Sequence, residues 1–128
     1  MTIRECAERA SALKMSGYNC CQAVAAAIAE MEGIPQEEMV KIASGFGMGM
    51  GNMQATCGAL VGAVMMAGIR TGGRSTVRFA RQISEGFKAV CGAVTCGDLK
   101  GVTGGKMLCS CDQCVRNAVL CYGEVFGL

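Results

Sequence analysis

The sequence predicts an all-α protein, a compact bundle of about five to six short helices around a central apolar helix. Three observations support this prediction. Apolar residues make up 52% of the chain and charged residues only 17%, a composition typical of a chain that folds around a core. Apolar side chains recur at helical spacing after capping residues, and no segment alternates as a half-buried strand would. With 128 residues, ten of them cysteine, we expect one cysteine-rich domain, residues 1–128.

The first three predicted helices span residues 3–15, 20–31 and 35–43. Thr2 and Glu5 form a capping-box pattern at the start of the first helix. Asn19 can cap the second helix, which is rich in alanine. Pro35 suits the first position of the third helix.

A glycine-rich loop is predicted at residues 44–55. Glycines alternate there with larger residues, which favours positive φ over a regular helix. Because Gly47, Gly49 and Gly51 lack side chains, their backbone amides could approach a bound cofactor closely. A simple connecting loop is the alternative.

The predicted central helix spans residues 57–69, with Thr56 as its cap. It is apolar on every side, which is typical of a buried helix. Gly58 and Gly62 are four residues apart and would let another helix approach closely. The stretch is too short to cross a bilayer, so no membrane span is predicted.

Two further helices are predicted in the second half of the chain. One follows Ser75 and extends to residue 90, and the other covers residues 111–125 after Ser110. Along the first of these, three arginines share the outer face and could dock an acidic redox partner protein: Arg74, Arg78 and Arg81. A solvated helix face is the alternative. The sequence predicts no oligomeric state.

Charge and composition exclude several classes of function. A net charge of +2 is too small for the electrostatic footprint of a nucleic-acid binder. The chain has no histidine, which excludes Ser-His, Cys-His and histidine-metal chemistry. Cysteine is therefore the residue that remains for chemistry.

The chain contains ten cysteines, at positions 6, 20, 21, 57, 91, 96, 109, 111, 114 and 121. Its first residues are charged and helical in pattern, with no apolar signal core. We therefore expect a cytoplasmic protein with reduced thiols rather than a secreted disulfide scaffold.

Four of these cysteines directly follow a residue that can cap a helix. The pairs are Asn19-Cys20, Thr56-Cys57, Thr95-Cys96 and Ser110-Cys111. A cysteine in the first helical turn faces free backbone N–H groups, which lower its pKa toward the thiolate. These four are the reactive candidates, and buried structural cysteine is the alternative.

The cysteine motifs resemble a known redox-active family, the one named for its C_GCAxxG_C_C pattern. Cys57-Gly-Ala-Leu-Val-Gly62 matches its central motif, and Tyr18 to Val24 resembles its opening Asn-Cys-x-Gln-x-Val segment. The resemblance places the third and fourth family cysteines at Cys96 and Cys111, with three alternatives at those positions: Cys91, Cys109 and Cys114. It implies redox activity but no particular substrate.

Four thiolates from separate helices suit an iron-sulfur cluster, with electron transfer as the function. The predicted ligands are Cys20, Cys57, Cys96 and Cys111, and the predicted cofactor contacts are Gly47, Gly49, Gly51 and Gly58. We favour [2Fe-2S], and expect that an aerobically prepared sample can lack the cluster.

Two alternatives remain open. Cys111 and Cys114 form a C-x-x-C at a capped helix start, which would suit thiol-disulfide exchange with Cys57 as a further catalytic residue. A structural zinc site is the other alternative, although zinc sites normally show two close ligand pairs. The sequence assigns no role to five cysteines: Cys6, Cys21, Cys91, Cys109 and Cys121.

Overall fold

The computed structural model, which describes residues 1–102 and 104–128, confirms the all-α fold. Within these ranges the elements are α1 (Ile3–Met15), α2 (Cys20–Glu32), α3 (Gln36–Ala43), a π-helical turn η1 (Gly49–Met53), α4 (Gly58–Thr71), α5 (Thr76–Cys91), α6 (Cys96–Lys100) and α7 (Cys111–Phe126). The sequence did not predict the short helix α6, because five residues are too few to show a periodic pattern. None of the described helices is long and apolar enough to cross a membrane.

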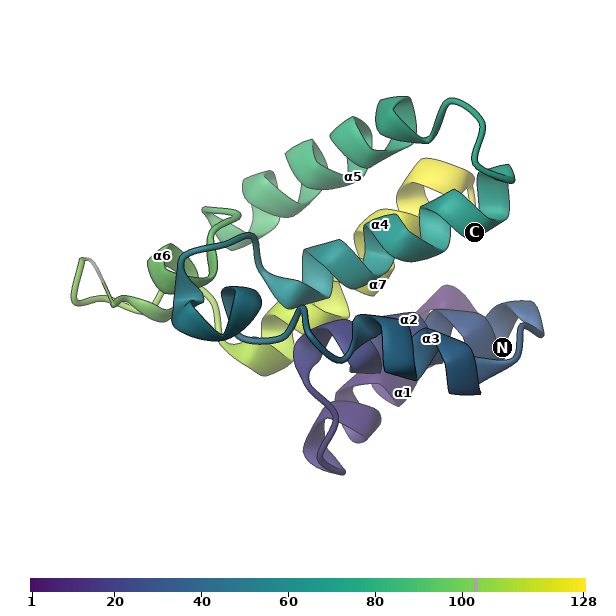
Figure 1. The fold of residues 1–128 in the computed structure, drawn as a ribbon. Coiled ribbons are helices and arrows are strands. Elements are labelled where there is room, and N and C mark those ends of the chain that lie inside the picture. The colour runs from purple at the N-terminus through teal and green to yellow at the C-terminus, as the bar shows by residue number, and fades with distance from the viewer. Residues whose placement is uncertain (103) are drawn as a thin grey trace.

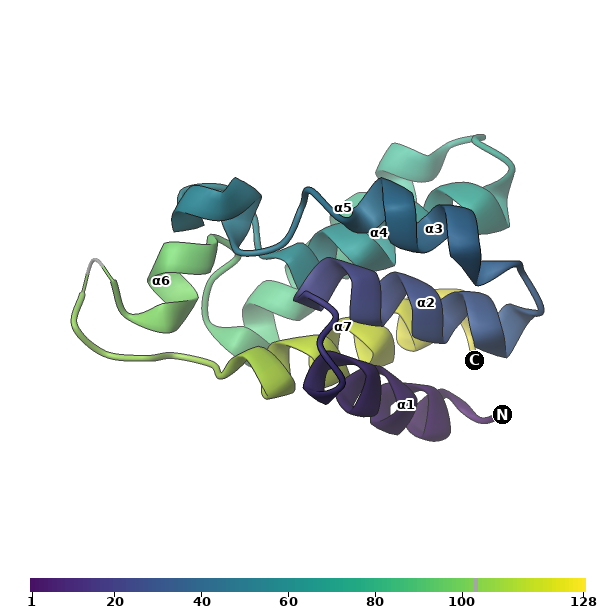
Figure 2. The same cartoon turned by 60° about the horizontal axis from the view of Figure 1, so that its bottom comes forward.

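The helices run in two directions along the bundle. Helices α2, α4 and α7 all begin at the end where α6 lies, whereas α1, α3 and α5 run toward that end (Figure 1). Both termini lie at the opposite end, and the view in Figure 2 shows the same arrangement. Several helix N-termini therefore gather around α6.

Helix α2 lies at the centre of the bundle, and the central position predicted for the 57–69 helix is not confirmed. Seven consecutive residues of α2, from Ala23 to Ala29, have no exposed surface, and α2 packs against α1, α3, α4 and α7. Helix α4 is more peripheral, since Ile69 is 40% exposed and Val61 and Val64 are only partly buried. The small side chains of α2 let neighbours approach on every side, which hydropathy alone does not reveal.

Helices α2 and α4 approach closely because two glycines of α4 face α2. A Cβ atom added at Gly62 would lie 2.7 Å from the carbonyl oxygen of Cys21. One added at Gly58 would lie 2.9 Å from the carbonyl oxygen of Phe46 and 3.3 Å from the backbone nitrogen of Cys21. No larger residue fits at either position without a shift of backbone.

The glycine-rich segment is more ordered than the predicted loop at 44–55. It contains the π-helical turn η1, in which Met50 and Gly51 have left-handed φ values of 64° and 82°. Met48, just before the turn, and Met53, its last residue, also have positive φ. The intervening glycines tolerate this conformation, so the segment folds into a tight turn that packs on α6.

We expect alanine at Gly62 to lower the free energy of unfolding by about 1–3 kcal/mol, because the new methyl group would overlap the Cys21 carbonyl. Gly68→Ala is the matched control on the same helix, since its Cβ would meet only Thr76 at 3.9 Å. The control should raise the free energy of unfolding by up to about 1 kcal/mol through helix propensity. Urea unfolding of both variants is the measurement, and equal stability would contradict the packing described here.

Candidate functional site

One cavity of about 330 Å³ lies where the helix beginnings meet. Its walls carry the four cysteines predicted as ligands and two lysines: Cys20, Cys57, Cys96, Cys111, Lys14 and Lys100. Three of these cysteines are the first residues of α2, α6 and α7, and Cys57 immediately precedes α4. The structure thus brings together side chains that span most of the chain, while their role as ligands stays a prediction.

The predicted caps hold at two of the four cysteines. The side chain of Asn19 accepts a hydrogen bond from the Gln22 amide at 2.9 Å, and that of Ser110 accepts one from the Gln113 amide at 3.1 Å. Thr95 occupies the cap position of α6 but makes no capping hydrogen bond through its side chain.

The prediction that Thr56 caps α4 is wrong, because Cys57 itself occupies the cap position. The Cys57 amide instead donates to the Val94 carbonyl at 2.7 Å, and the Cys96 amide donates to the Ala55 carbonyl at 2.9 Å. These two bonds flank the antiparallel bridge between Thr56 and Thr95. The bridge draws Thr56 away from the helix and holds Cys57 and Cys96 in fixed register.

Three of the four glycines predicted as cofactor contacts lie at the cavity or next to its wall. Gly58 lines it. A Cβ added at Gly49 would lie 2.6 Å from the Cβ of Cys96, and one added at Gly47 would lie 2.5 Å from the Asn19 side chain. Gly51 is exposed, and its Cβ would meet nothing within 4 Å. The structure therefore does not bring Gly51 to the site.

A second group of cysteines lies beside the cavity. The sulfurs of Cys91, Cys109 and Cys114 all lie within 4.8 Å of one another, and all three residues are buried. Among the residues that the structure describes, this is the one group of three or more metal-ligating side chains so closely spaced. The sequence offered these residues as alternatives for the third and fourth family positions, and Cys114 also as a member of the C-x-x-C dithiol.

The family model described as "Putative redox-active protein (C_GCAxxG_C_C)" matches residues 18–125. The chain belongs to this family. The match includes the cavity cysteines and the glycine-rich segment. Searches of curated proteins and of solved structures gave no match.

Of the cavity cysteines in this family member, Cys111 has the most strongly favoured thiolate. A hydrogen bond donated by the Cys20 thiol lowers the pKa of Cys111 to about 5, against the opposing effect of burial, and the charges of Lys100 and Lys14 assist. The same hydrogen bond, together with burial, raises the pKa of Cys20. Cys20 and Cys111 thus form a thiol-thiolate pair across the cavity.

Cys57 forms a second such pair with Cys114. A hydrogen bond from the Cys114 thiol lowers the pKa of Cys57 to about 7, and the backbone N–H groups of Ala59 and Leu60 contribute against the effect of burial. The pKa of Cys114 is raised by the same bond. Cys57 occupies the N-cap position of α4, where these backbone N–H groups favour its thiolate.

Lys100 is the functional residue that the sequence reasoning missed. Its ammonium group donates to the Cys109 carbonyl at 3.1 Å and to the Cys114 sulfur at 3.6 Å. Burial lowers its pKa, but the neighbouring sulfurs of Cys114, Cys111 and Cys57 more than offset this and raise the pKa overall. The available signal was its spacing, because Lys100 lies four residues after Cys96, on the same face of a helix.

The remaining cysteines lie outside both groups. Cys6, Cys21 and Cys121 are buried in the core. Burial raises the pKa of Cys6 and of Cys21 to about 12, so these thiols stay protonated and act as small apolar side chains.

The pKa of Cys111 predicts the pH dependence of its alkylation in reduced, metal-free protein. We expect iodoacetamide to modify Cys111 at a rate that is half-maximal near pH 5, because the thiolate dominates above its pKa of about 5. Cys20→Ala should move this midpoint upward most, and Lys100→Met should move it less, whereas Lys41→Met, an exposed control on α3, should leave it unchanged. Mass spectrometry of peptides measures the rates. A midpoint near the ordinary thiol value of about 8.5 would contradict this account.

Proposed function

We propose that this protein transfers electrons through an iron-sulfur cluster held by Cys20, Cys57, Cys96 and Cys111. The observation that carries the proposal is that four cysteines from four helix beginnings line a single cavity. When bound, such a cluster takes up and releases one electron. Cysteine thiolates are the usual ligands of iron-sulfur clusters, so the donor set fits the group.

Among the described residues, no three of the four cavity sulfurs lie as close together as a single metal ion requires. A tetrahedral zinc ion with Zn–S bonds of about 2.3 Å requires sulfurs about 3.8 Å apart. Among the described residues, the cysteines that meet a 4.8 Å limit are Cys91, Cys109 and Cys114, not three of the cavity set. A structural zinc site at the cavity is therefore disfavoured.

Positively charged and N–H groups around the cavity offset the negative charge of the cysteine thiolates. Lys14 and Lys100 place two ammonium groups on its walls, and the helix beginnings direct backbone N–H groups toward the sulfurs. Cys57, Cys96 and Cys20 are at most 9% exposed, while Cys111 is more accessible. The chain thus shields one side of the cavity from water and leaves the Cys111 side open to a redox partner.

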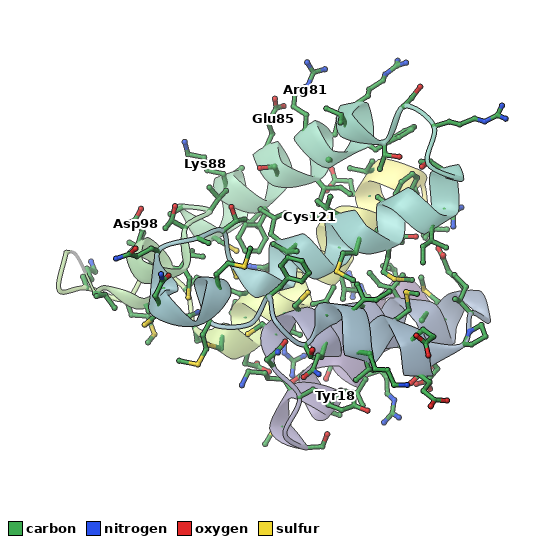
Figure 3. The ribbon with its side chains drawn as sticks, viewed as in Figure 1. Tyr18, Arg81, Glu85, Lys88, Asp98 and Cys121 are labelled. Atoms are coloured by element: carbon green, nitrogen blue, oxygen red, sulfur yellow. The ribbon has the colours of Figure 1, made fainter. Side chains whose placement is uncertain are left out.

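The arginine stripe is less well placed for such a partner. Arg74, Arg78 and Arg81 are exposed, and Arg81 points away from the bundle (Figure 3). However, they lie around the first turns of α5, at the end of the bundle remote from α6 (Figure 1). A partner docked there would lie far from the cavity, so a solvated face is the better interpretation of this stripe.

Thiol-disulfide exchange is the second candidate, and a specific observation changes its form. Cys111 and Cys20 shift each other's pKa, as do Cys57 and Cys114, so the two members of the C-x-x-C interact with different cysteines. The inter-helix pairs Cys20–Cys111 and Cys57–Cys114 are therefore better candidates for a disulfide than Cys111–Cys114. Each would form by loss of two protons and two electrons to an external oxidant. We propose a cytoplasmic location for either function, because thiols stay reduced there.

Cys57→Ser should abolish the cluster in protein purified anaerobically, because serine removes one of the four proposed ligands. We expect iron and acid-labile sulfide to fall at least tenfold, with loss of visible absorption. Cys121→Ser is the matched control, a buried cysteine outside both groups, and should retain both. Cys114→Ser should also retain iron, since Cys114 does not line the cavity.

The same samples distinguish the alternatives. Wild-type protein that contains zinc without iron would contradict the cluster and support a structural site. Metal-free protein that titrates with two electrons, and loses this behaviour in Cys114→Ser, would support disulfide exchange through the Cys57–Cys114 pair. The [2Fe-2S] form corresponds to two irons and two sulfides per chain.

A further inference from the structure

Cys91, Cys109 and Cys114 come from three separate parts of the fold. Cys91 is the last residue of α5, Cys109 precedes α7, and Cys114 lies in the first turn of α7. Their sulfurs nevertheless all lie within 4.8 Å of one another. This limit includes the separation of about 3.8 Å that a single ion with metal–sulfur bonds of about 2.3 Å requires.

The backbone around this cysteine triad is held by hydrogen bonds. The amides of Leu108 and Cys109 both donate to the Leu99 carbonyl, at 2.9 and 3.2 Å. The Cys114 amide donates to the Ser110 carbonyl at 2.8 Å within the first turn of α7. The three sulfurs are therefore brought together by fixed segments of chain and not by a flexible loop.

Polar side chains contact two of the three sulfurs, as the groups that support metal ligands commonly do. The amide of Asn117 donates to the Cys91 sulfur at 3.3 Å, and the ammonium group of Lys100 lies 3.6 Å from the Cys114 sulfur. Groups that hydrogen-bond metal ligands commonly orient them and offset their charge. Cysteines that merely fill a core need neither an amide donor nor a half-buried cation beside them.

We infer that Cys91, Cys109 and Cys114 form a second metal site, which binds one thiophilic d¹⁰ ion, Zn²⁺ or Cu⁺. Soft thiolate ligands select these ions. Three thiols lose three protons to solvent on binding, and no electron is transferred. Cu⁺ would take the three sulfurs alone, whereas Zn²⁺ would complete a tetrahedron with one water. This site shares no ligand with the proposed iron-sulfur cluster, since none of its three cysteines lines the cavity, although Cys114 neighbours Cys57.

The test measures iron, zinc and copper together in anaerobically purified protein from cells supplied with zinc or with copper. We expect one zinc or one copper per chain in addition to iron, and X-ray absorption at the zinc or copper edge should show three sulfur neighbours. Cys109→Ala should lower this second metal at least tenfold while iron is retained. Cys121→Ala is the matched control, because the buried residues Cys109 and Cys121 each have 7% of their surface exposed. The Cys121→Ala variant should retain both metals; Cys121 is labelled in Figure 3.

A reciprocal variant separates the two proposals. Cys96→Ser should lose iron and retain zinc or copper, so the second site can stand if the cluster proposal fails. Zinc or copper content that is unchanged in Cys109→Ala would overturn the inference, as would wild-type protein with neither ion or with a disulfide within the triad. If circular dichroism shows that Cys109→Ala is unfolded, the sulfur count at the wild-type metal decides, and four sulfurs or none would contradict the site.

Discussion

The close approach of α2 and α4 is the constraint on which the site depends. Gly62 lets α4 pass so near to α2 that a single added methyl group would meet the Cys21 carbonyl at 2.7 Å. Because the two helices run in the same direction, this contact places Cys20 and Cys57 at the same end of the bundle. The bridge that joins the Cys57 and Cys96 segments then fixes the third cysteine, and α7 adds the fourth.

The same geometry determines the electrostatics of the cavity. Of the four cysteines at helix beginnings, Cys57 and Cys111 have a lowered pKa, each chiefly through a neighbouring thiol, whereas Cys20 and Cys96 have a raised one. Burial raises the pKa of Cys96, as it raises those of Cys6 and Cys21. Lys100 adds a cation between the cavity and the cysteine triad and connects the two groups. The chain thus separates its reactive sulfurs from those that only fill the core.

Much of the fold could be predicted from local patterns, because caps such as Asn19 and Ser110 act within one turn of chain. The central motif from Cys57 to Gly62 was visible for the same reason. The prediction that Thr56 caps α4 was wrong, because the bridge from Thr56 to Thr95, far along the chain, overrides the local preference. Neither the cysteine triad nor the role of Lys100 could be predicted, because each depends on contacts between separate helices. The central position of α2 likewise depends on how tightly small side chains pack.

Electron paramagnetic resonance of the anaerobically purified, dithionite-reduced protein tests the central claim most directly. If four cysteines hold a [2Fe-2S] cluster in this cavity, the reduced protein will give a signal from one unpaired electron per chain. That signal will disappear in Cys57→Ser and persist in Cys121→Ser. A reduced wild-type protein that contains no iron and gives no signal would contradict the account.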